Sequence, residues 1–160
     1  MNLLAIDPGN TESGYCLMDT ETMQPIEFGK IPNKEMEDLI SNMSGIGQIV
    51  IEKIASYGMA VGREVFDTCV EIGRMSMIAE MMRIPVGYVF RKDEKLTICG
   101  SPRANDSNIR RALIDRFAKH DFKNGKGTKS DPDWFYGFRA DVWAAYAVGV
   151  TWRELYGYQG

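Results

Sequence analysis

The sequence predicts a single α/β domain with a mixed five-stranded sheet, in which the first three strands are antiparallel and helices pack on the sheet. Short apolar runs separated by polar turns fill the first 31 residues, and two later runs of the same kind alternate with segments of helical spacing. The length of 160 residues and the hydrophobic content of 44% suffice for one core and leave little room for two. We therefore treat residues 1–160 as one domain.

Turn residues bound the three opening strands. The apolar run 3–6 is stopped by Asp7-Pro8-Gly9, in which Pro presets one turn angle and Gly tolerates a positive φ, so the first strand ends at Asp7. Ser13–Asp19 and Pro25–Ile31 follow as two further strands joined by polar turns. The start of the chain is therefore predicted to be an antiparallel unit.

A helix, a strand and a long helix come next. Apolar residues recur at helical spacing over 36–43, and Gln48–Glu52 is a β-branched run that is too short for a helix. Glu64–Met82 is apolar on two sides: Phe66, Cys69, Val70, Gly73, Met77 and Met81 on one, Ile72, Met75, Ala79 and Met82 on the other. Two apolar faces need two partners, so we expect the sheet on one side and a second copy of the chain on the other, with plain core packing as the alternative.

The C-terminal half supplies the fifth strand and two more helices. Pro85–Phe90 is the strand, and a helix begins with capping residues at Asp106-Ser107. A loop rich in Gly, Lys and Asp covers 121–137, and the last helix runs from about 140 to 155. The predicted order is three strands, helix, strand, helix, strand, helix, loop and helix.

The composition excludes several kinds of site. The three cysteines, Cys16, Cys69 and Cys99, are odd in number and widely spaced, which argues against a disulfide framework or a zinc knuckle. His120 is the single histidine, so multi-histidine metal sites are excluded and acid, base or metal chemistry must depend on carboxylates. No apolar run approaches the length of a membrane helix, and we expect a soluble, cytoplasmic protein without a membrane partner.

The formal net charge of -3 conceals a basic strip in the C-terminal part. Residues 1–100 hold 9 Lys and Arg against 15 Asp and Glu, whereas residues 101–160 hold 10 against 7. The basic residues between 101 and 129 are Arg103, Arg110, Arg111, Arg116, Lys119, Lys123, Lys126 and Lys129. Such a strip is compatible with phosphate binding, and a solvated helix face with its loop is the alternative.

Three carboxylates stand at places where they can converge. Asp7 and Glu52 each end a predicted strand, and Asp141 opens the last helix. Mg²⁺ and similar hard cations prefer oxygen ligands and often take a few carboxylates together with water and substrate phosphate. These acids are therefore candidate metal ligands, although acids at strand ends and helix starts are also common caps.

Three segments resemble motifs of the RuvC family of Holliday-junction resolvases. Residues 3–15 are similar to its first strand, which carries an Asp in an Ile-Asp-Pro-Gly setting followed by Gly-Tyr, and residues 50–53 are similar to its second acidic motif. Residues 141–149 resemble its last motif, Asp-x-x-Asp-Ala-x-Ala. The loop 125–129 with Tyr136-Gly137 further resembles phage-encoded branches of that family.

The resemblance implies an RNase H-like fold and paired phosphodiester hydrolysis of four-way DNA junctions by a homodimer. It assigns two Mg²⁺ or Mn²⁺ ions to Asp7, Glu52 and Asp141, with Asp7 bridging them. It places an aromatic residue after the second acid for unstacked bases, a role open to Tyr57, which could equally be an ordinary loop residue. The expected DNA contacts from the basic strip are Arg103, Arg110, Arg111, Lys123, Lys126 and Lys129. The expected location is the cytoplasm of a bacterium or a phage-infected cell.

Two positions depart from the family pattern. Ala144 stands where the last motif has its second Asp, and Asp106 stands where the family has a lysine, which Arg103 or a loop lysine could replace. The alternatives are therefore a nuclease for flaps or other branched DNA, and a junction-binding protein that has lost cleavage. Asp7–Thr11 also resembles the phosphate loop of actin-like ATPases, but those are much longer, two-lobed proteins.

Overall fold

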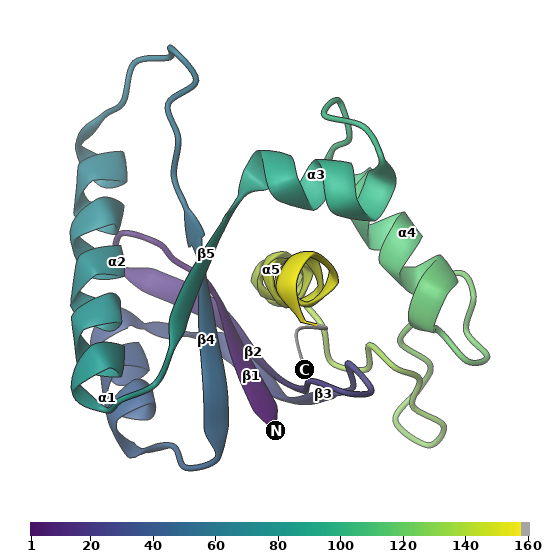
Figure 1. Ribbon diagram of the computed structural model, residues 1–160. Helices are drawn as coiled ribbons and strands as arrows, with labels where there is room; N and C mark the ends of the chain where they lie inside the picture. The colour runs from purple at the N-terminus through teal and green to yellow at the C-terminus, as the bar shows by residue number, and fades with distance from the viewer. Residues whose placement is uncertain (158–160) are drawn as a thin grey trace.

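A five-stranded mixed sheet lies at the centre of the molecule, as Figure 1 shows for the computed structural model, which describes residues 1–157. The strand order is β3-β2-β1-β4-β5. β1 (Asn2–Asp7), β2 (Glu12–Asp19) and β3 (Pro25–Pro32) are antiparallel, whereas β4 (Ile46–Lys53) and β5 (Val86–Phe90) run parallel to β1. The predicted strands and the mixed sheet are confirmed.

Helices cover both faces of the sheet (Figure 1). α1 (Asn33–Asn42) and α2 (Arg63–Met81) pack on one face, and α5 (Ala140–Tyr156) crosses the other. α3 (Arg91–Cys99) and α4 (Asp106–Phe117) lie beyond α5 and contact it. No helix in the described part of the chain is both long enough and apolar enough to cross a membrane.

The two faces of the sheet belong to two hydrophobic cores. Leu3 and Ala5 are buried with α5, whereas Leu4 and Ile6 are buried with α1 and α2. Because side chains alternate along a strand, Asp7 falls on the α5 face. The parallel register pairs Ile6 with Ile51, so Glu52 is adjacent to Asp7 and on the same face.

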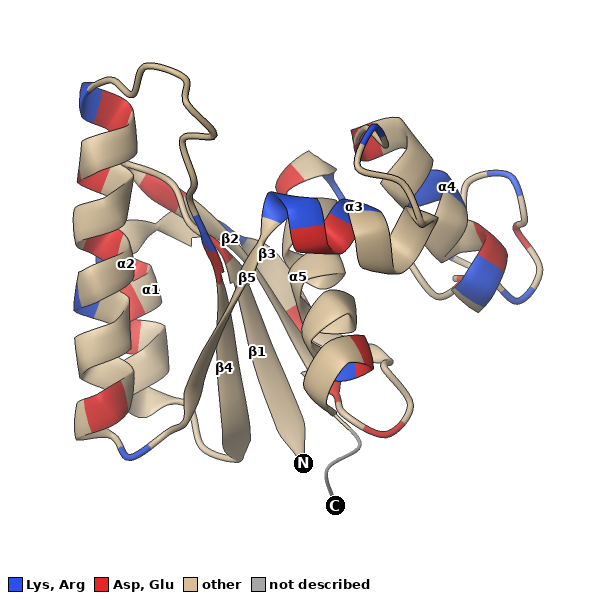
Figure 2. Ribbon diagram, turned by 45° about the horizontal axis from the view of Figure 1, so that its top comes forward, with Lys and Arg blue, Asp and Glu red and all other residues tan. Residues whose placement is uncertain are grey.

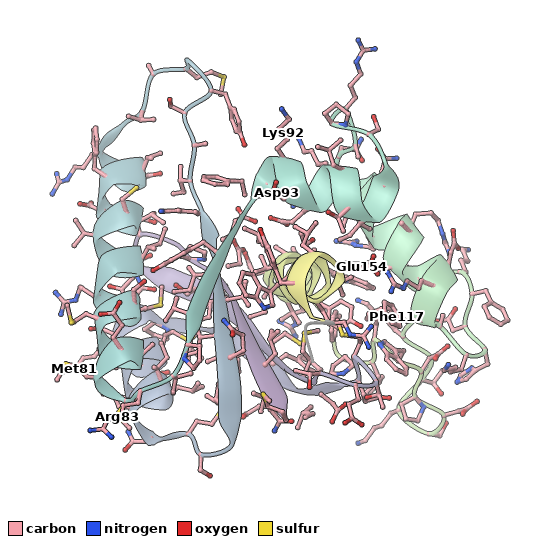
Figure 3. The ribbon with its side chains drawn as sticks, viewed as in Figure 1. Met81, Arg83, Lys92, Asp93, Phe117 and Glu154 are labelled. Atoms are coloured by element: carbon pink, nitrogen blue, oxygen red, sulfur yellow. The ribbon has the colours of Figure 1, made fainter. Side chains whose placement is uncertain are left out.

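α2 has the two faces that its sequence predicts. Ile72, Met75 and Ala79 are buried against the sheet. The outer face is exposed at Phe66, Val70, Met77 and Met81, and Figure 3 shows Met81 on the side of α2 away from the sheet. The sequence pattern grouped Met82 with Ile72, Met75 and Ala79. In the structure Met82 is instead the C-terminal cap of the helix and is exposed.

α3 is an element that the sequence pattern did not predict. It follows β5 directly, and the Asp93 carboxylate accepts a hydrogen bond of 2.7 Å from the Phe90 N–H to cap its first turn. Only Glu94 within it is buried, so the apolar periodicity that identifies a surface helix is missing. α3 brings charged residues close to α5.

Two aspartates organise the loop 118–139 that leads into α5. The Asp133 carboxylate accepts backbone N–H bonds from residues 119, 120, 121 and 134 at 2.6–3.1 Å. Burial alone would raise the pKa of Asp133. These hydrogen bonds outweigh burial and hold that pKa well below its usual range. Asp121 accepts three more from residues 124, 126 and 127. The loop is therefore tied down by its own main chain.

Candidate active site

The three predicted carboxylates, Asp7, Glu52 and Asp141, line one cavity of about 260 Å³. Asp7 and Glu52 come from the ends of adjacent parallel strands, and Asp141 comes from the first turn of α5. The remaining lining residues are Arg91, Asp106, Ala140 and Ala144. The structure thus brings together the candidates that the sequence placed far apart.

The turn after Asp7 is fixed by a small hydrogen-bond network. Gly9 N–H donates to Ser13 Oγ at 3.2 Å, and the Ser13 hydroxyl donates to Asn33 Oδ1 at 2.6 Å. Asn33 Nδ2 returns a bond of 2.9 Å to the Gly9 carbonyl. Because Ser13 and Asn33 are buried, the bonds hold the turn, and with it the end of β1, in one geometry.

Gly14 sets the position of Asp141 relative to Asp7. Gly14 pairs with Asp7 across β1 and β2. The first turn of α5 packs against it so closely that a Cβ there would lie 2.6 Å from the Asp141 carbonyl oxygen. A side chain at position 14 would therefore push Asp141 away from the site.

The three carboxylates form one electrostatic unit. Burial, and then repulsion from Glu52 and Asp141, raises the pKa of Asp7 to about 7. A divalent cation would relieve that repulsion, and the all-oxygen donor set suits Mg²⁺ or Mn²⁺. Within residues 1–157 no three Asp, Glu, His or Cys side chains already stand close enough together to hold a metal ion, so binding one requires the carboxylates to draw together.

Two cations at the site were not predicted from the sequence. Lys30 Nζ of β3 pairs with Asp141 Oδ2 at 3.1 Å, with both side chains partly exposed. Arg91, the first residue of α3, pairs with both Glu94 and Asp106. Acidic and basic residues lie next to one another along α3 in Figure 2. Nothing in the sequence near either residue marks it as a site residue, because only the tertiary fold brings β3 and α3 next to these carboxylates.

Glu94 is a buried acid next to the site. Its side chain is fully inaccessible, and its Oε2 has no hydrogen-bond partner in the described structure. Burial, and then the neighbouring Glu52 carboxylate, raises the pKa of Glu94 well above its usual range, while Arg91 opposes the rise. No signal in the sequence marks Glu94, because it lies in a helix that the sequence pattern did not predict.

Comparison with known proteins rests on structure. No protein-family model matches the sequence, and no curated protein matches it. RuvC of Thermus thermophilus superposes with a TM-score of 0.68 at 14% identity, over 94% of this chain and 92% of RuvC. The same enzyme in complex with a Holliday junction substrate gives 0.73 at 11% identity, over 97% and 94%. The chain has a RuvC-like fold. At this identity the likeness establishes the fold alone.

The basic strip of this RuvC-like domain borders a larger cavity of about 450 Å³. Arg110, Lys123 and Lys126 line it, and the Arg110 guanidinium lies 5.3 Å from the centre of the Trp143 ring. A smaller cavity between α4 and α5 shares Arg110 and Trp143 with this one, and shares Arg91, Asp106, Ala140 and Ala144 with the acidic cavity. The basic loop and the carboxylates are thus linked along α4.

The other predicted DNA contacts differ in their surroundings. Arg111 is engaged within the protein: its guanidinium donates to Asp115 and to the carbonyls of Phe122 and Lys123. Arg103 lines a separate cavity beside α3 and α4. Lys129 is exposed further along the loop. Tyr57 is 61% exposed in the loop between β4 and α2, with a φ of 48°.

Proposed function

We propose that this protein is a divalent-metal-dependent endonuclease that resolves four-way DNA junctions as a homodimer. One observation carries the proposal: on a RuvC-like fold, Asp7, Glu52 and Asp141 share a cavity, in which burial and then repulsion from Glu52 and Asp141 raise the pKa of Asp7 to about 7. Mutually repelling carboxylates at a sheet edge are what a cation-assisted phosphoryl site requires. The activity of the RuvC in the junction complex belongs to that enzyme, and its fold supports the same substrate class here.

The mechanism follows from the chain's own groups. Asp7, Glu52 and Asp141 would hold Mg²⁺ or Mn²⁺, which supplies activation of a water and charge stabilisation at the scissile phosphate. Asp7 must lose its proton to act as a ligand, and Lys30 must release Asp141 Oδ2. Neither step needs a histidine base, in agreement with the single histidine of the chain.

The outer face of α2 is the proposed dimer interface. Phe66, Val70, Met77 and Met81 form an exposed apolar stripe on the helix, with 56–75% of each residue accessible. A two-fold axis through such a face would present two cavities to the opposed strands of a junction, which has near two-fold symmetry. Two cuts per junction follow from two sites per dimer.

The basic cavity beside α4 is the proposed contact to the DNA backbone. Arg110, Lys123 and Lys126 would neutralise phosphates there, and Arg103 in the separate cavity beside α3 and exposed Lys129 would extend the contact. Arg111 also lines this cavity, where it would contact phosphate while its internal bonds hold the loop in place. Exposed Tyr57 would stack on an unpaired base at the junction centre.

Ala144 favours a second candidate function, that of a protein that binds junctions but does not cleave them. Ala144 lines the acidic cavity one helical turn from Asp141, so a second carboxylate from α5 is missing there. A site with fewer acids would bind the metal more weakly. A nuclease for flaps or other branched DNA would use the same chemistry on a different substrate.

One experiment separates these candidates. Labelled four-way junctions, flaps and linear duplexes are incubated with and without Mg²⁺ or Mn²⁺, using wild type, Asp7→Asn and Ala144→Asp. Paired nicks in the junction, abolished by Asp7→Asn, are the expected result. Equal cutting of all substrates would contradict junction resolution, and binding that becomes cleavage only in Ala144→Asp would identify a disabled enzyme.

A further inference from the structure

Arg91 reaches the acidic cavity from the start of α3. Of the described residues that line this cavity, it is the sole cation, and it faces the carboxylates Asp7, Glu52 and Asp141. These acids repel a DNA phosphate, so a strand can enter only where positive charge offsets them. Lys30, the other nearby cation, lines an adjacent cavity and pairs with Asp141.

One end of the Arg91 guanidinium is fixed inside the protein. Nη1 lies 3.1 Å from Oε1 of Glu94, whose side chain is fully inaccessible. A hydrogen bond to a buried carboxyl group is costly to break, because its loss would leave a buried polar atom without a partner. Glu94 therefore holds the arginine in place at the wall of the cavity.

The other end of the guanidinium is exchangeable. Nη2 pairs with Asp106, whose side chain is 84% exposed. An exposed ion pair contributes little to stability, so a phosphate can replace the Asp106 carboxylate at small cost. The planar fork of arginine also matches two oxygens of a phosphate, which a lysine cannot do.

We propose that Arg91 is a catalytic residue that binds the phosphate to be cut, and that Asp106 occupies the same guanidinium nitrogen until DNA displaces it. The inference rests on the proposed nuclease function and adds the group that admits the substrate phosphate to an acidic site. It also gives Asp106 a role, as a competitor that lowers affinity for DNA.

The competing explanation is that Arg91 only neutralises Glu94. The single variant Arg91→Met leaves Glu94 buried without its partner and can fail to fold. The double variant Arg91→Met/Glu94→Gln removes the guanidinium and replaces the buried carboxyl group with a neutral amide, so it tests the arginine in a folded protein. Lys92→Gln is the matched control, because Lys92 is the next residue of α3 and is exposed. Figure 3 shows it on the side of α3 away from α5.

The test combines junction binding in Ca²⁺ over a salt series with cleavage in Mg²⁺. We expect the double variant to cut about 100-fold more slowly, and its slope of log Kd against log salt to fall by about 0.9, the loss of one phosphate contact. Asp106→Asn should bind the junction severalfold more tightly than wild type, and Lys92→Gln should match wild type in both measurements.

An unchanged salt slope in the double variant would overturn the inference, whatever the cleavage rate. A wild-type cleavage rate in that variant would also overturn it. If wild type binds junctions but cuts none of the substrates, the nuclease proposal fails. A slope difference between wild type and the double variant would then still place Arg91 on a DNA phosphate.

Discussion

Gly14 in β2 lies directly against Asp141 in α5. A Cβ at Gly14 would stand 2.6 Å from the Asp141 carbonyl oxygen and 3.0 Å from the Asp141 Cβ. Gly14 is also the residue that pairs with Asp7 across the first two strands. One missing side chain therefore sets the spacing between two of the three candidate metal ligands.

Gly14→Ala should impair cleavage more than folding. The extra methyl forces the first turn of α5 outward, with a cost in unfolding free energy of about 1–3 kcal/mol. A displacement of about 1 Å at Asp141 should lower the cleavage rate about 100-fold. Gly29→Ala is the control, because a Cβ there meets only the Tyr15 ring at an ordinary 3.5 Å. Equal rates for Gly14→Ala and wild type would contradict this account of the site.

Asp7→Asn should stabilise the metal-free protein at high pH. The pKa of Asp7 rises from 3.8 to about 7 on folding, so its stabilising contribution is full below pH 3.8 and is lost as the pH rises through 7. Asparagine mimics the protonated form. At pH 8 in EDTA we therefore expect a gain of at most about 4 kcal/mol in unfolding free energy, falling to near zero at pH 4.

Urea titrations across this pH range measure the effect. Asp38→Asn replaces an exposed carboxylate on α1 and should change stability little at any pH. If Asp7→Asn is no more stable than wild type at pH 8, Asp7 is not the strained member of the carboxylate cluster.

Metal affinity should increase with pH over the same interval. Binding requires ionised Asp7, so Mn²⁺ should bind more tightly at pH 8 than at pH 6 and release protons near pH 7. Calorimetry in two buffers of different ionisation enthalpy counts those protons. Proton release that persists in Asp7→Asn would assign the titration to another residue.

Asp133→Asn should loosen the basic loop without touching the active site. The amide oxygen can replace only part of the acceptor capacity that four backbone N–H groups use, at a cost of about 2 kcal/mol. We expect lower stability and weaker junction binding, because Lys123 and Lys126 lose their fixed positions. Asp131→Asn, at an exposed carboxylate two residues away, should behave as wild type in both assays.

Val70→Lys/Met77→Lys should produce a folded monomer. Both side chains are exposed on the outer face of α2, so two lysines remove apolar contact area and add repulsion across a two-fold axis without disturbing the core. Light scattering after size exclusion measures the mass, and the monomer should nick a junction without pairing the cuts. Ile26→Lys, at an exposed apolar residue of β3, is the control. A monomeric wild type would refute the interface.

The sequence was most informative where local signals and tertiary packing agree. The Asp7-Pro8-Gly9 turn, the run ending at Glu52 and the helix opening near Asp141 all occur as predicted. α3 escaped prediction because its stability comes from a capped start and from contact with α5 rather than from an apolar stripe. A pattern-based prediction has no access to those contacts.

The same limit applies to the site. Strand ends marked Asp7 and Glu52, because parallel neighbours end at one edge of a sheet, and a helix start marked Asp141. Lys30 and Arg91 lie in an edge strand and an unpredicted helix, so charge alone gave no reason to prefer them over the basic strip. Arg111 lies in the predicted basic strip and lines the basic cavity, but its guanidinium also braces the loop through the Phe122 and Lys123 carbonyls, which the sequence did not indicate.

α5 carries Asp141 at its exposed start, while most of its length is buried between the sheet and the aromatic side chains of the preceding loop. Tyr146 accepts a hydrogen bond from Trp134 and donates one to the Met23 carbonyl, which joins this helix to two distant segments. Amide hydrogens in the middle of α5 should consequently exchange with solvent only when the whole domain opens. The buried body of α5, and with it the placement of the helix that carries Asp141, is then as durable as the native state itself.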